Sequence, residues 1–138
     1  MTRSADRLDA FTYGYAYTML WANVSSEDGE VSPDWWQTPA EGWELDAFTP
    51  AARAQIAADC GDFMLANVRD LMAYTRHYGD TVAAWRQAGG DFALTRNHHG
   101  AGYWDRGVGA VGDRLTSAAH VYGDCNGDVG PDDLVTLF

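Results

Sequence analysis

The sequence predicts an α+β fold, with N-terminal helices, one of them long, packed on a small antiparallel sheet of hairpins with one further helix. In residues 1–90, apolar residues recur at three- and four-residue steps, which is typical of helices that bury one face. In residues 91–138, short runs that suit strands flank one amphipathic stretch, and glycine-rich turns separate them. The length of 138 residues suits a single domain, which we expect to span the whole chain.

Two long helices are expected in the N-terminal half. The first begins at Ser4, whose hydroxyl can cap it, and ends near Asn23. Its apolar stripe consists of Leu8, Phe11, Tyr15, Met19 and Ala22. The second begins at Thr49 and Pro50, a capping hydroxyl followed by proline at the first helical position, and runs to near Tyr74. Its stripe consists of Ile56, Cys60, Phe63, Asn67 and Leu71.

Residues 24–48, between these helices, combine turn-forming residues with aromatic ones. Three tryptophans fall within this stretch: Trp35, Trp36 and Trp43. Disordered linkers are poor in aromatic residues, so we expect an ordered loop that folds onto the body of the protein or forms a docking surface. The three tryptophans are therefore candidate binding residues.

After the long helix we expect a short helix over Asp80–Ala88, stopped by the pair Gly89-Gly90. Phe92–Arg96 then alternates in a way that suits a strand, and Tyr103–Asp105 can pair back with it as a hairpin. A further amphipathic helix is expected from Val108 to about Tyr122.

The last residues predict a terminal hairpin around the turn formers of residues 130–133. Asp124, Asn126 and Asp128 match the first ligands of an EF-hand loop, which leaves weak Ca²⁺ binding as an alternative. Val129 and Val135, however, stand where that loop needs glycine and a glutamate. We therefore prefer the hairpin, and we expect neither a structural metal nor a cofactor.

The stretch Asp91–Gly107 concentrates histidines, glycines, arginines and aromatic residues. We interpret it first as a rigid hairpin, in which glycines allow positive φ at the turn and aspartates pair with Arg96 and Arg106. The residues expected to build this motif are Gly100, Gly102, Trp104, Asp105, Arg106 and Gly107. Those expected to face a partner are Asn97, His99 and Tyr103.

A catalytic interpretation of the same stretch stays open. His99 could act as general acid or base with Asp105 orienting it, while Arg96 and Arg106 steady an anion. A two-histidine, one-carboxylate metal site from His99, Asp105 and His120 is a further alternative, although their spacing in sequence does not bring them together. We favour the hairpin, because the stretch supplies no clear nucleophile or metal cage.

Residues 91–107 resemble the signature D-F-x-L-T-R-N-x-H-G-A-G-[FY]-W-D-R-G of small, uncharacterised proteins encoded by tailed bacteriophages and prophages. The similarity continues through Gly112–Thr116 to the end of the chain, and upstream it includes Asp59, Cys60, Asp62, Phe63 and Asn67. The chain departs from the signature at His98, which leaves His99 as the histidine that matches it. The resemblance implies a phage accessory protein that acts inside an infected bacterium by binding a macromolecule.

The charge balance is strongly acidic, with 20 Asp and Glu against nine Lys and Arg, and a net charge of −11. Direct binding to nucleic acid is not expected, because it depends on cations that neutralise phosphates. The acidity can simply serve solubility, or spaced carboxylates can imitate the phosphates of DNA. Cys60 lies in an apolar stripe, and there is neither a signal peptide nor a long apolar run, so we expect a protein of the host cytoplasm without a membrane span.

These observations support one leading hypothesis and two alternatives. The leading hypothesis is a non-enzymatic protein that binds a host or phage protein and modulates or inhibits a host factor. In one form of this hypothesis, the host factor is a nucleic-acid-handling defence enzyme, and the protein engages it through a DNA-mimic surface. The first alternative is a small hydrolase acting on a phosphoester or nucleotide with His99 as acid or base. The second is a phage structural or assembly component.

Overall fold

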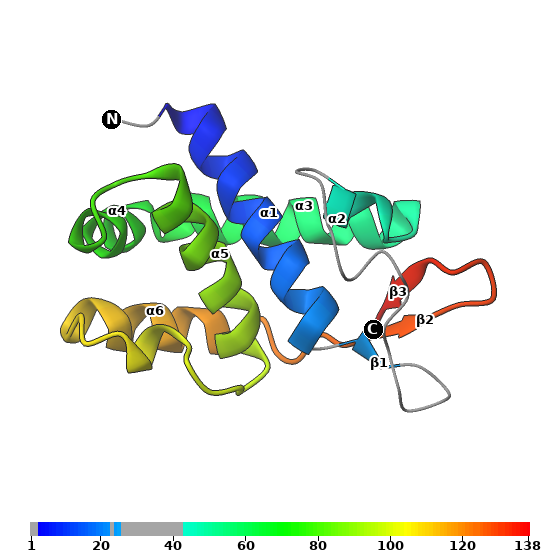
Figure 1. Cartoon of the computed structure of the whole chain (residues 1–138). Helices are drawn as coiled ribbons and strands as arrows, with labels where there is room; N and C mark the ends of the chain where they lie inside the picture. The colour runs from blue at the N-terminus through cyan, green and yellow to red at the C-terminus, as the bar shows by residue number, and fades with distance from the viewer. Residues whose placement is uncertain (1–2, 23, 26–42) are drawn as a thin grey trace.

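The computed structural model describes residues 3–22, 24–25 and 43–138 (Figure 1). The expected α+β class is confirmed, because helices dominate the described residues and a small sheet lies at one end of them. The helices are α1 (Ser4–Ala22), α2 (Trp43–Asp46), α3 (Pro50–Ala66), α4 (Val68–His77), α5 (Val82–Arg96) and α6 (Ala110–His120), with a 3-10 turn over Tyr103–Asp105. The strands are β1 (Val24–Ser25), β2 (Gly127–Val129) and β3 (Val135–Leu137).

Aromatic side chains fill the core where α1, α3 and α5 meet. Phe11, Phe63 and Phe92, one from each of these helices, are fully buried. The rings of Phe63 and Phe92 stack with their centroids 4.1 Å apart, and Phe11 lies 6.0 Å from each of them. Such large rings bury much apolar area per residue, so this cluster holds the three helices together.

The second predicted helix is divided in two. Thr49 caps α3 as expected, since its hydroxyl accepts a hydrogen bond from the backbone N–H of Ala52 at 3.2 Å. The helix nevertheless ends at Ala66 and not near Tyr74, and α4 follows it after Asn67. Asn67 leaves the helical conformation with φ −123°, and its side chain donates to the carbonyl of Phe63 at 2.9 Å. Asparagine side chains compete with the helix for backbone groups in this way, which explains the break.

Gly89 and Gly90 lie inside α5, so both the predicted helix stop and the predicted strand over Phe92–Arg96 are wrong. The pair serves a close crossing of α1 and α5. A Cβ atom on Gly89 would lie 1.8 Å from the carbonyl oxygen of Phe11, and one on Gly14 would lie 1.8 Å from that of Arg86. Every residue from Ala88 to Arg96 is buried, so this part of α5 has no polar face and shows no helical periodicity.

The predicted hairpin over residues 91–105 is also wrong, since α5 continues to Arg96 and Tyr103–Asp105 forms a 3-10 turn. The connecting loop takes left-handed backbone at His98 (φ 58°) and Ala101 (φ 67°), not at the two glycines that were expected to supply it. Gly102 is required for space instead. A Cβ atom there would lie 2.4 Å from Oγ1 of Thr95 and 2.3 Å from the ring of Trp104.

The terminal hairpin forms as predicted. β2 and β3 are antiparallel, with Gly127 opposite Leu137 and Val129 opposite Val135. β1 adds to β2 in parallel, giving the strand order β1-β2-β3. Val135 is fully buried and its backbone bridges to Phe48, which attaches the sheet to the start of α3. None of the helices in the described residues is long and apolar enough to cross a membrane.

Candidate functional site

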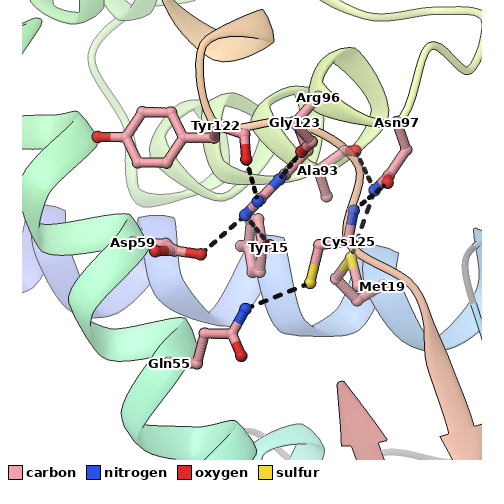
Figure 2. A network of polar contacts seen from close by, with 10 residues as sticks. All are labelled: Tyr15, Met19, Gln55, Asp59, Ala93, Arg96, Asn97, Tyr122, Gly123 and Cys125. Carbon is pink, nitrogen blue, oxygen red and sulfur yellow. Dashed lines mark hydrogen bonds and ion pairs between the residues drawn. The ribbon is translucent and has the colours of Figure 1, made fainter. Parts of the chain in front are cut away.

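Arg96 is the centre of a buried polar network that ties four parts of the chain together (Figure 2). Its side chain is only 4% exposed. Nη1 donates to Oδ2 of Asp59 at 2.8 Å and to the Tyr15 hydroxyl at 3.0 Å. Nε and Nη2 donate to the carbonyl oxygens of Gly123 and Tyr122 at 2.8 and 3.0 Å. Aspartates within and just after the motif (Asp91, Asp105 and Asp113) were expected as partners, and this was wrong for Arg96, whose partner is Asp59 on α3.

A second network surrounds Asp91, which lies on α5 as Arg96 does. The Asp91 side chain is 1% exposed and accepts hydrogen bonds from Arg106, through Nε at 2.9 Å and Nη2 at 2.7 Å. The Tyr74 hydroxyl donates to the same carboxylate, and Gln87 donates to that hydroxyl at 2.9 Å. Burial raises the pKa of Asp91 even though Arg106 and Tyr74 oppose the shift by bonding the charged form.

Further motif residues point inward and hold the loop after α5. Thr95 Oγ1 accepts the backbone N–H of Tyr103 at 3.1 Å, and the Tyr103 hydroxyl donates to the carbonyl of Ala88 at 2.6 Å. Asn97 Oδ1 accepts the backbone N–H of Cys125 at 2.7 Å, as Figure 2 shows. Asn97 and Tyr103 were expected to face a partner, but their side chains form hydrogen bonds within the chain.

The two arginines of the catalytic interpretation neutralise different carboxylates. Arg96 pairs with Asp59 on α3, whereas Arg106 pairs with Asp91 on α5. His99 and Asp105 are exposed. Among the described residues no ion pair joins Asp105 to either arginine.

The structure offers no support for the metal alternatives within the residues that it describes. No three His, Cys, Asp or Glu side chains there are placed to hold an ion. Asp124, Asn126 and Asp128 are exposed. His120 instead stacks on His98, with ring centroids 4.3 Å apart.

The tryptophan-rich loop falls mostly outside the described residues. This applies to Trp35, Trp36 and the side chain of Trp43, although the backbone of Trp43 begins α2. Their predicted role in binding stays a prediction.

A groove between α1 and α5 is the candidate site that the sequence analysis missed. It is a shallow cavity of about 350 Å³, which we call the α1–α5 groove. Side chains of Tyr13, Tyr17 and Trp21 line it from α1, and Arg86 and Arg106 are also among its lining residues. Tyr17 is 43% and Trp21 50% exposed.

Two ring contacts organise the groove. The rings of Tyr13 and Tyr17 are parallel to within 3°, with centroids 6.4 Å apart. The guanidinium of Arg86 lies over the Tyr13 ring at 4.4 Å, a cation–π contact. Tyr13 and Arg86 also border a second cavity of about 550 Å³ that extends toward Asp6, Asp9 and Leu45. The signal for this site was the four-residue spacing of the three aromatic residues, on a face of α1 other than the buried stripe.

No family model, curated protein or solved structure matches the chain.

Proposed function

We propose that this chain is a non-catalytic, phage-encoded binding protein that modulates or inhibits a host protein by docking it on the α1–α5 groove. The exposure of Tyr17 and Trp21 beside Tyr13 and Arg86 carries the proposal. Trp, Tyr and Arg are the side chains that most often dominate the binding energy of protein interfaces. The phage context rests on the resemblance described above for residues 91–107 and the stretches on either side of them.

The arrangement of these side chains supports binding more than their exposure alone does. Val121 is 85% exposed, but a single exposed aliphatic residue is ordinary on a protein surface. In the groove, by contrast, three aromatic residues follow one another along α1 and share a cavity with two guanidinium groups. Aromatic and arginine side chains gathered in this way are enriched at protein interfaces.

A hydrolase receives less support from the same geometry. Arg96 would have to bind a substrate anion, yet its side chain is 4% exposed and already donates to Asp59 and to two carbonyl oxygens. Arg106 is committed to Asp91. Two arginines that neutralise separate carboxylates, the buried Asp91 and the partly buried Asp59, explain the arginines of the motif without any chemistry.

The test is capture of a host protein from lysate by the purified chain, compared between matched variants. Trp21→Ala and Tyr17→Ala should each reduce the captured amount by roughly tenfold or more, as for central interface residues. Val121→Ala removes an exposed side chain outside the groove and should leave capture unchanged. A captured protein whose recovery is the same for all three variants would exclude the groove as the interface.

A further inference from the structure

We infer that the α1–α5 groove receives an uncharged, proline-rich segment of the partner in the polyproline II conformation. The prolines of that segment lie on the aromatic side chains of α1, and its backbone carbonyl oxygens accept hydrogen bonds from them. This inference rests on the proposed function, because it names the kind of segment that the partner presents.

The charged residues that line the groove are engaged by neighbouring groups. The carboxylate among them, Asp91, is 1% exposed and accepts two hydrogen bonds from Arg106. This bidentate pair neutralises Arg106 as well as Asp91. The guanidinium of Arg86 lies over the Tyr13 ring and also borders the second cavity, whose lining includes two aspartates. The groove therefore favours neither sign of charge, and an uncharged segment is its complementary occupant.

The hydrogen-bond donors of the groove indicate the conformation of that segment. In the part of the chain that the structure describes, no hydrogen bond occupies the Tyr17 hydroxyl or the Trp21 indole N–H. An occupant that covers these donors without accepting from them deprives them of water, which is costly. The carbonyl oxygens of a helix are already bonded within the helix, whereas those of polyproline II are not. Proline also lacks the N–H that would itself need an acceptor, so a proline-rich segment satisfies both sides of the contact.

The spacing of the aromatic rings fits the same conformation. The rings of Tyr13 and Tyr17 are parallel to within 3°, with centroids 6.4 Å apart. Polyproline II advances about 3.1 Å per residue, so two residues span about 6.2 Å. From Tyr13 to Trp21 the aromatic residues cover roughly 12 Å of α1 at 1.5 Å per residue, the length of about four residues of such a segment. Aromatic-lined grooves bind proline-rich segments favourably because this conformation is already formed and costs little entropy.

The probe is a labelled decaproline peptide, blocked at both ends so that it carries no charge. The comparator is an equally uncharged amphipathic peptide of about 16 residues, with a leucine and phenylalanine stripe on a glutamine background, which presents a helix. Fluorescence anisotropy should show decaproline binding at least roughly tenfold more tightly. Because decaproline is uncharged, the net charge of −11 on the chain does not attract or repel it, and its affinity should change by less than about twofold between low and high salt.

Four results would overturn the inference. They are tighter binding of the helical peptide, equal affinities for the two peptides, no binding of decaproline, and a steep loss of decaproline binding in salt.

Two conservative variants assign the effect to the donors of the groove. Trp21→Phe and Tyr17→Phe keep an aromatic ring but remove the N–H or the hydroxyl, so each should weaken decaproline binding by roughly three- to tenfold, as for one lost hydrogen bond. Both side chains are about half exposed, so the chain should keep its fold, which circular dichroism checks. Val121→Ala lies outside the groove and should leave the affinity unchanged. Unchanged affinity in both phenylalanine variants would also overturn the inference.

Failure of this inference and failure of the proposed function give different results. A host protein captured in a Trp21-dependent way, together with no preference for decaproline, would refute this inference and leave the proposed function intact. Selective binding of decaproline without any captured host protein would do the reverse.

Discussion

Asp91 and Arg106 together show how the charged residues of the motif are used. The Asp91 carboxylate is 1% exposed, and three donated hydrogen bonds from Arg106 and Tyr74 compensate for its burial. Burial of an ion pair is often close to neutral for stability, but removal of one partner leaves an uncompensated charge. The motif aspartate is therefore better explained as a fixed structural partner than as a reactive group.

Arg106→Ala should consequently destabilise the protein by about 3 kcal/mol at neutral pH, the usual cost of breaking a buried pair. Burial already raises the pKa of Asp91, and loss of Arg106 raises it further. A carboxyl group with a raised folded-state pKa favours folding most below its ordinary value of 3.8 and loses that contribution as pH rises through the folded-state pKa. The defect of the variant should therefore shrink as the pH is lowered toward that value, as measured by urea unfolding at several pH values.

Arg114→Ala is the matched control for this prediction. Arg114 makes the same kind of bidentate pair, with Asp70, but its side chain is 59% exposed. Exposed pairs contribute little, so this variant should unfold close to the wild type at every pH. A pH-independent defect in Arg106→Ala, or equal defects in the two variants, would contradict the role assigned to Asp91.

Arg96 gives a second prediction at the same scale. Its planar guanidinium donates to a carboxylate, a phenol and two carbonyl oxygens at once, a set of directions that an ammonium group cannot reproduce. Arg96→Lys should therefore cost roughly 2 kcal/mol or more although it keeps the charge, because buried acceptors lose their donors. Denaturant unfolding measures this cost. Arg53 forms a half-exposed pair with Asp46, so Arg53→Lys should leave the free energy of unfolding nearly unchanged.

At the scale of elements, the crossing of α1 and α5 depends on glycine. Gly89→Ala places a methyl group 1.8 Å from the Phe11 carbonyl oxygen, so the two helices must separate. We expect a loss of at least about 2 kcal/mol, typical of strong overpacking in a core. Thermal unfolding and the near-ultraviolet circular dichroism of the core aromatic residues measure the effect.

Gly61→Ala is the control, because Gly61 also lies inside a helix but has no atom within 4 Å of an added Cβ. Alanine there should stabilise α3 by roughly 0.5–1 kcal/mol through helix propensity alone. Opposite signs for the two glycine variants would establish that the glycine in α5 is required by packing. Two stabilising variants would contradict the close crossing.

The same crossing explains how much of the fold could be predicted. Local signals in the sequence correctly predicted α1, the cap at Thr49, the helix after Gly109 and the terminal hairpin. The glycine pair in α5 carries a local signal for a stop, but the approach of α1 overrides it. Because α5 is buried on all sides near its end, its sequence lacks the helical period, and the run Phe92–Arg96 was therefore predicted as a strand. Tertiary contacts determine the secondary structure in this part of α5, and such contacts cannot be inferred from a single sequence.

The site was predictable to a similar extent. Arg106 pairs with Asp91, an aspartate of the motif, but the expectation for Arg96 was wrong, because its partner Asp59 lies 37 positions away and gives no local signal. The aromatic residues of the α1–α5 groove did carry a signal, their four-residue spacing, but it identifies a face only once the buried stripe of α1 is set apart.

At the scale of the whole molecule, the net charge of −11 and the α1–α5 groove should act on different steps of binding. Long-range charge changes the rate of encounter, whereas buried aromatic contacts change the rate of dissociation. For a partner with a basic surface, the association rate constant should fall by roughly tenfold or more as salt is raised, while the dissociation rate changes little.

Trp21→Ala should show the complementary behaviour. Half of the Trp21 side chain is exposed in the free chain, and its loss removes contact area but no charge. The dissociation rate should therefore rise by roughly tenfold or more, and the salt dependence of association should match that of the wild type. Surface plasmon resonance with the captured partner at several salt concentrations separates the two rates. If Trp21→Ala slowed association instead, or if salt acted mainly on dissociation, the charged surface and the groove would not be separate contributors, and the DNA-mimic form of the binding hypothesis would lose its kinetic basis.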